Sequence, residues 1–135
     1  LTLSKDNHTK LKPNREDLMS IKRGIHSLNK LNAYNHVQGL VVGNSSIIVI
    51  ETSKGTKKML QSIKKSKNFQ AILIKFPKKK QDLRVDLPTV GLDTLKDCKR
   101  AGIKGIVLKS KQNVFLDKIK SISYANKNKM FIKVK

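Results

Sequence analysis

Short apolar runs that alternate with segments of helical spacing restrict the fold of this chain more than any other sequence feature. Apolar runs predict strands at residues 37–42, 47–50, 71–74, 103–108, 114–116 and 130–134. Helices are predicted over residues 14–31, 56–63, 92–101 and 117–128. This alternation predicts one α/β or α+β domain, in which a compact mixed sheet packs against short helices.

The segments between these elements refine the prediction. Residues 43–46 read GNSS between two apolar runs, which indicates a β-hairpin, and Gly102 is placed to end a helix in the left-handed conformation. Residues 76–91 contain two of the three prolines and no periodicity, so we expect a loop there. Residues 1–12 are polar and aperiodic, which predicts a linker or disordered lead-in before a domain over residues 13–135.

The charge of the chain has two explanations that composition does not separate. Its 135 residues include 30 Lys or Arg and 9 Asp or Glu, a net charge of +21. Most of the basic residues are lysines accompanied by many Asn and Ile, a profile that AT-rich codons produce without selection for binding. A positive field would equally attract nucleic acid, an anionic membrane or a phosphorylated substrate. The absence of Trp and the scarcity of other aromatic residues count against a stacking platform for single-stranded nucleic acid.

The densest group of chemically useful side chains follows the predicted strand at residues 71–74. Asp82, Arg84 and Asp86 alternate, so an extended backbone would project all three to one side. Two close carboxylates can hold a divalent metal or act as a general base, and a guanidinium suits a phosphate oxygen. The alternative is an Arg–Asp ion pair that only stabilises the loop.

A second group lies at residues 51–56, which read ETSKGT. Glu51 ends an apolar strand, and Gly55-Thr56 opens a predicted helix whose backbone N–H groups could face an anion. The alternatives are that Thr56 is a simple N-cap and that Glu51 faces solvent.

The remaining reactive side chains are expected to be structural. Cys98 falls within a helical pattern and is interpreted as a packed thiol, and a single cysteine excludes an internal disulfide. His8, His26 and His36 lack the spacing of metal ligands. Asp93 and Asp117 are expected to cap helices.

Residues 81–94, which read QDLRVDLPTVGLDT, resemble the signature GQDxRxDLPxxGxxT of the LpxI-type UDP-2,3-diacylglucosamine pyrophosphatases. Further matches occur in the family's order along the chain, among them Asp17, Glu51, Lys75 and Asp117. The resemblance covers about residues 10–135, which corresponds to the C-terminal domain of that family.

The resemblance implies an enzyme of lipid A biosynthesis that hydrolyses the diphosphate of UDP-2,3-diacylglucosamine to lipid X and UMP. Water attacks the α-phosphorus with the help of a divalent cation, usually Mg²⁺. An N-terminal Rossmann-like domain, absent from this chain, is implied to form the other side of the substrate site, so the isolated chain is expected to be inactive. The implied location is the cytoplasm, with the inner-membrane surface as a candidate partner and nucleic acid disfavoured.

The same resemblance assigns roles to individual residues. Asp82 and Asp86 are implied to be catalytic and, together with Glu51, to be metal ligands. Substrate contacts are implied at Lys75, Gln81, Arg84, Gly55 and Thr56.

The chain departs from the family pattern at Lys57, Lys80 and Lys109, where the family commonly has Asp, Gly and an acidic residue respectively. Fewer carboxylates near a metal site would weaken cation binding. The alternative function is therefore a non-catalytic basic domain that binds anionic lipid or nucleic acid.

Overall fold

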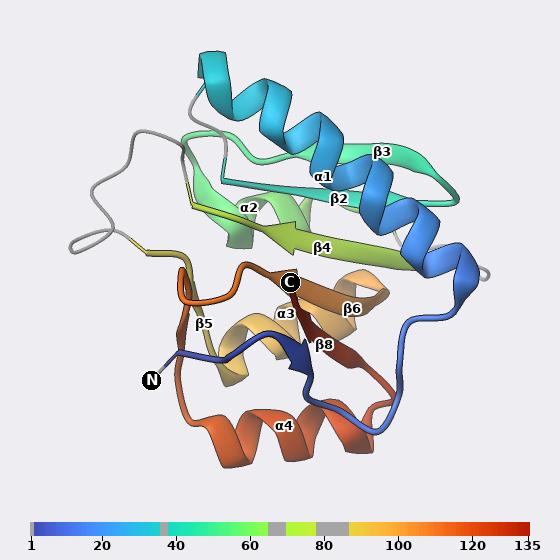
Figure 1. Ribbon diagram of the computed structural model, residues 1–135, viewed down its shortest axis with the longest axis vertical. Coiled ribbons are helices and arrows are strands. Elements are labelled where there is room, and N and C mark those ends of the chain that lie inside the picture. Colours follow the sequence, from blue (N-terminus) through green and yellow to red (C-terminus); the bar gives the residue numbers. More distant parts are fainter. Residues whose placement is uncertain (1, 36–37, 65–69, 78–86) are drawn as a thin grey trace.

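The computed structural model describes residues 2–35, 38–64, 70–77 and 87–135. A six-stranded mixed sheet has the order β1-β8-β6-β4-β2-β3. Its strands are β1 (Asp6–Asn7), β2 (Gly39–Gly43), β3 (Ser46–Ile50), β4 (Ala71–Lys75), β6 (Ile103–Leu108) and β8 (Phe131–Val134). The helices are α1 (Arg15–Asn35), α2 (Gly55–Gln61), α3 (Leu92–Ala101) and α4 (Lys118–Lys127). The predicted fold class, a compact mixed sheet with short helices, is confirmed (Figure 1).

Helices cover both faces of the central strand β4, and every residue of that strand is buried. Ala71 and Leu73 contact the core beneath α2, α3 and α4, while Ile72 and Ile74 contact the core beneath α1. This alternation explains why β4 reads as a continuous apolar run. Gly24 lets α1 approach closely, since a Cβ there would lie 2.4 Å from Cδ1 of Ile74.

The chain direction brings several strand ends to one edge of the sheet. Strands β4, β6 and β8 are parallel, and α3 and α4 connect them in turn. Strand β2 is antiparallel to β4 and begins beside its last residue, with Gly39 opposite Lys75. We call this side, where β4, β6 and β8 end, the carboxyl edge, because ligands of open α/β sheets bind beyond it.

The predicted loop at residues 76–91 differs from the structure at its end. Strand β5 (Thr89–Val90) pairs in parallel with β7 (Val114–Phe115) and forms a second, two-stranded sheet. Two residues are too few to show a strand periodicity in sequence. This small sheet connects the residues before α3 to the chain that follows β6.

Helix ends follow the predictions in part. Gly102 ends α3 with φ of 80°, which confirms the left-handed stop. Asp93 is not a cap, because Gly91 occupies the N-cap position of α3 and Asp93 lies in the first turn. Asp117 occupies the N-cap position of α4, but its side chain makes no capping hydrogen bond there. Its φ of 48° is left-handed, whereas a capping side chain normally requires extended backbone.

Residues 2–12 pack against the domain and are not the expected linker. Asp6–Asn7 forms β1, which pairs with β8, and Leu3 is only 1% exposed. The Leu3 amide donates to Oδ1 of Asn113 at 3.0 Å, and Nδ2 of Asn113 donates to the Leu3 carbonyl. Strand β1 has only two residues, and Leu3 is a single buried leucine before it. Neither produces a periodic pattern, so the sequence could not reveal this packing.

This packing predicts a stability effect at a position where a linker would show none. Leu3→Ala is expected to lower the free energy of unfolding by about 2–4 kcal/mol, because it leaves a cavity in the core. Leu18→Ala is the matched control, since Leu18 is an exposed leucine of α1 and surface substitutions usually change stability by about 0.5 kcal/mol or less. Urea denaturation measures both, and equal effects would contradict the packed N-terminal segment.

Candidate active site

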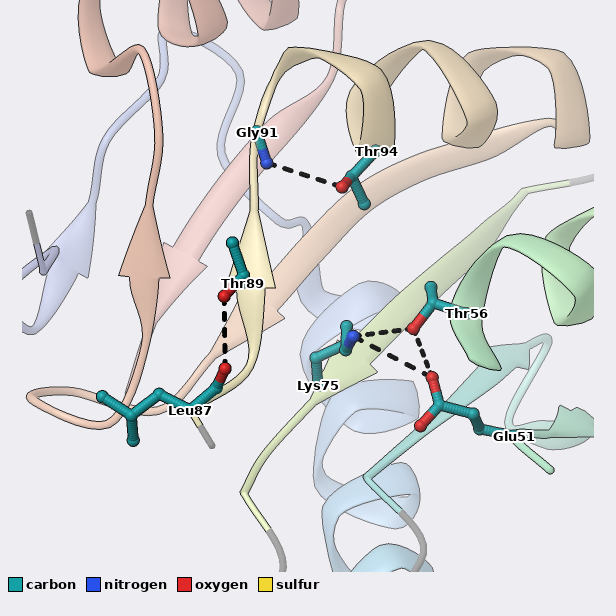
Figure 2. Close-up of polar contacts among 7 residues, drawn as sticks. All are labelled: Glu51, Thr56, Lys75, Leu87, Thr89, Gly91 and Thr94. Carbon is teal, nitrogen blue, oxygen red and sulfur yellow. Dashed lines mark hydrogen bonds and ion pairs between the residues drawn. The ribbon is translucent and has the colours of Figure 1, made fainter. Parts of the chain in front are cut away.

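Three side chains from separate parts of the chain meet at the carboxyl edge (Figure 2). Lys75, the last residue of β4, donates from Nζ to Oγ1 of Thr56 at 2.6 Å. The same Nζ lies 3.9 Å from Oε1 of Glu51, and the Thr56 hydroxyl donates to that carboxylate oxygen. The side chains of Lys75 and Glu51 are each 9% exposed. The lysine and glutamate charges are thus paired in a largely buried network.

Local backbone geometry produces this network. Glu51 directly follows β3, and its amide donates to the Gly39 carbonyl at 2.9 Å. A Cβ at Gly39 would lie 3.2 Å from the Ile74 carbonyl oxygen, so glycine lets the start of β2 pack closely against the end of β4 beside Glu51. Gly55 begins α2 with φ of +91°, a conformation that favours glycine. The turn at Gly55 places Thr56 where its hydroxyl reaches Glu51.

The structure departs from the simplest interpretations of residues 51–56. Thr56 is not the N-cap of α2, because Lys54 occupies that position and Thr56 lies in the first turn. Glu51 does not face solvent, because Lys75 and Thr56 engage it. A signal for this arrangement was present in the sequence. Lys75 ends a buried apolar run, and a buried ammonium requires a partner of opposite charge or a hydrogen-bond acceptor.

A second lysine lies at the same edge. Leu108, the last residue of β6, pairs in register with Lys75, so Lys109 follows directly beside the network. Nζ of Lys109 lies 5.9 Å from the centroid of the Phe76 ring, within the range of a cation–π contact. Lys57 and Lys109 are both exposed, but Lys57 lines a groove with Gln61 and Asp97. Of these two departures from the family pattern, Lys109 is the one at the carboxyl edge beside Lys75.

Most of the predicted site motif lies outside the described residues. Residues 78–86 include Gln81, Asp82, Arg84 and Asp86, and their assigned roles stay predictions. The described chain on either side belongs to the carboxyl edge: residues 76–77 follow β4, and residues 87–91 lead through β5 into α3. On the second side, Oγ1 of Thr89 donates to the Leu87 carbonyl at 3.2 Å (Figure 2). The described segments on either side of residues 78–86 therefore both lie where α/β proteins bind ligands.

A family model described as the LpxI C-terminal domain matches residues 4–133. The chain belongs to the LpxI C-terminal domain family. This match confirms the resemblance carried by residues 81–94.

The chain is similar in sequence to a curated protein, the UDP-2,3-diacylglucosamine pyrophosphatase LpxI of Caulobacter vibrioides. The two are 27% identical over 140 residues, which cover 98% of this chain and 50% of the relative. The chain thus spans about half the length of the curated relative that it matches. The relative's name describes a hydrolase, and this chain is homologous to half of it.

The residues of this LpxI domain that the structure describes include no group of three or more His, Cys, Asp and Glu that could hold a metal ion. Glu51 was expected to be a metal ligand, but its Oε1 accepts from Thr56 and lies beside the Lys75 ammonium. An ammonium that close competes with a metal cation for the same carboxylate. Of the three expected ligands, Asp82 and Asp86 retain the chemistry that suits Mg²⁺, since carboxylate oxygens are its usual protein donors.

Cys98 is a packed thiol, as predicted. It is fully buried and makes no disulfide. Burial raises the pKa of the Cys98 thiol far above its ordinary value, and the neighbouring Asp97 charge raises that pKa further. Since the thiolate is the nucleophilic form, Cys98 is not suited to covalent catalysis.

Among the helices of the described residues, none has the length and apolar character required to cross a bilayer.

Proposed function

We propose that this chain is the C-terminal domain of a UDP-2,3-diacylglucosamine pyrophosphatase that produces lipid X and UMP in lipid A biosynthesis. The observation that carries the proposal is the LpxI family match over residues 4–133, with the described segments on either side of residues 78–86 at the carboxyl edge. The Lys75 network at that edge adds a cation suited to a diphosphate.

The proposed reaction is hydrolysis of a phosphoric anhydride. A water oxygen attacks the α-phosphorus, and the bond from that phosphorus to the bridging oxygen breaks. UMP keeps the incoming oxygen, and lipid X leaves with the β-phosphate and the bridging oxygen. In this proposal Asp82 or Asp86 orients the water and accepts its proton, while Arg84 and Gln81 hold phosphate oxygens.

Lys75 is proposed to face the developing negative charge of the diphosphate. Its hydrogen bond to Thr56 and its ion pair with Glu51 restrict the ammonium to one position before substrate arrives. Thr56 and Glu51 are then positioning residues, and Gly55 contributes the turn that presents Thr56. Under this assignment Glu51 holds Lys75 instead of the metal.

Mg²⁺ is the proposed cofactor, and Asp82 and Asp86 are the residues that would hold it. When bound, Mg²⁺ would neutralise part of the negative charge on the phosphate oxygens. The proposed partners are an N-terminal domain that completes the substrate site and the cytoplasmic surface of the inner membrane, from which a lipid-linked substrate would be taken. Nucleic acid is not a proposed partner.

The test compares this chain alone with a protein that also carries the proposed N-terminal domain. The longer protein is expected to release UMP and lipid X from UDP-2,3-diacylglucosamine, and the 135-residue chain alone is expected to release neither. EDTA should abolish the release, and added Mg²⁺ should restore it. Turnover by the chain alone would contradict the two-domain site, and full activity in EDTA would contradict the metal assignment.

A further inference from the structure

The outer side of α4 carries an unusually exposed apolar residue. Ile119 lies in the first turn of α4, and it is 86% exposed. Ile122 follows at i+3 on the same side and is half-buried. These side chains belong to a groove of about 570 Å³ lined by Lys10, Lys118, Ile119, Ile122, Ser123, Asn126 and Lys127. We call this the α4 groove.

Lysines border the apolar centre of the α4 groove. Among its lining residues, all of which the structure describes, three are lysines and none carries a carboxylate. The N-terminal segment contributes Lys10, whose amide donates to Oδ1 of Asn126 at 2.8 Å. The groove therefore combines isoleucine side chains with positive charge from two separate parts of the chain, a combination that matches an anionic amphiphile.

The chain just before α4 contacts the residues that lead into α3, in the region of the proposed active site. Leu116, 44% exposed, is separated from the first residue of α4 by the exposed Asp117, and its amide donates to the Val90 carbonyl at 2.8 Å. A Cβ at Gly91 would lie 3.2 Å from Cβ of Leu116. Leu116 thus places the start of α4 near Val90 and Gly91 of the family motif.

We propose that the α4 groove docks the protein on an anionic membrane surface. The inference rests on the proposed function, because a substrate with two acyl chains is drawn from a bilayer. A surface helix with isoleucines at its centre and lysines around them can place the apolar side chains among the acyl chains and the lysines among anionic headgroups. A lysine border without acidic residues matches an anionic lipid surface in charge.

This docking orients the whole domain. Figure 1 shows α1 and α4 at opposite ends of the molecule, so a membrane against α4 leaves α1 facing away from it. The small sheet β5–β7 leads into both α3 and α4, and its position beside Leu116 brings the carboxyl edge close to the lipid headgroups. The diphosphate of a membrane lipid could then reach the carboxyl edge while its acyl chains remain in the bilayer.

The test measures binding of the 135-residue chain to vesicles of phosphatidylcholine with and without phosphatidylglycerol, by flotation at physiological salt. Ile119→Ser is expected to weaken binding to the anionic vesicles about tenfold, because it removes an inserted apolar side chain. Lys118→Gln with Lys127→Gln is expected to weaken it about 25-fold, since each lysine near an anionic surface contributes about fivefold. Neutral vesicles are expected to bind weakly in every case.

Matched controls come from α1. Met19→Ser removes an apolar side chain that is 61% exposed, and Lys22→Gln with Lys30→Gln removes two exposed charges. These controls are expected to leave vesicle binding nearly unchanged. If the α1 variants weaken binding as much as the α4 variants do, the attraction comes from net charge alone and the proposal is overturned.

Other outcomes also decide the proposal. Failure of the unaltered chain to bind anionic vesicles overturns it, as does a loss of vesicle binding when the proposed N-terminal domain is attached, since a protein partner would then cover the groove. The vesicles contain no UDP-linked lipid, and Asp82→Ala is expected to bind them like the unaltered chain. Loss of the proposed hydrolysis with vesicle binding intact therefore disproves the function and not the docking surface.

Discussion

Asp82→Asn and Asp86→Asn are each expected to lower kcat/KM for UDP-2,3-diacylglucosamine by about 10³-fold in the protein that carries both domains. Each substitution removes a carboxylate proposed to hold Mg²⁺ or to orient the attacking water, and neither role can be taken over by an amide. Release of UMP measures the effect.

The Mg²⁺ concentration that gives half-maximal activity separates the two aspartates. A variant that has lost mainly a metal ligand should require more Mg²⁺ and recover part of its activity at saturation. A variant that has lost the water-orienting base should stay slow at any Mg²⁺ concentration. Asp97→Asn is the matched control, since Asp97 pairs with Arg100 on α3 and has no proposed role in the reaction. Activity like that of the unaltered protein in both Asp82 and Asp86 variants would contradict these roles.

Lys75→Met is expected to lower kcat/KM by about 10²-fold, because it removes a preorganised positive charge from the diphosphate site. The substitution also leaves the Glu51 carboxylate without its ion-pair partner, so the free energy of unfolding should fall by about 3 kcal/mol. Glu51→Gln should have a smaller effect on kcat/KM, since the Thr56 hydroxyl still positions Lys75.

The control for Lys75→Met is a similar ion pair away from the carboxyl edge. Nζ of Lys104 lies 2.7 Å from Oδ2 of Asp17, and both side chains are largely buried. Lys104 lies near the start of β6, whereas Lys75 lies at the end of β4. Lys104→Met should therefore destabilise the fold by about as much while leaving kcat/KM nearly unchanged. Equal losses of activity in the two variants would mean that Lys75 acts only through stability.

Local sequence patterns predicted the fold well where an element was long or strongly apolar. The helical spacing that begins at Leu18 predicted α1, and the GNSS turn predicted the β2–β3 hairpin. The weakest predictions concerned short elements. Strands β1 and β5 each have two residues, and their strand character arises from partners distant in the chain. Propensity and periodicity contain no information about such partners.

The candidate site was predicted unevenly. Residue types and the family signature identified residues 81–94 and their chemistry. They did not predict that Glu51 would engage Lys75, because each residue was interpreted within its own segment. Asp93 and Asp117 show the same limitation, since an acidic residue near a helix start indicates a cap only if the backbone is extended there.

The sequence by itself determined the types of the main elements, the family and the side chains able to handle a diphosphate, because these depend on neighbours along the chain. The tertiary structure alone decided which groups meet at the carboxyl edge. Thr56 and Lys75 are 19 positions apart and come together because β2 pairs with both β3 and β4. That pairing buries Lys75, and the cost of burying an unpaired charge explains why Glu51 and Thr56 lie beside it.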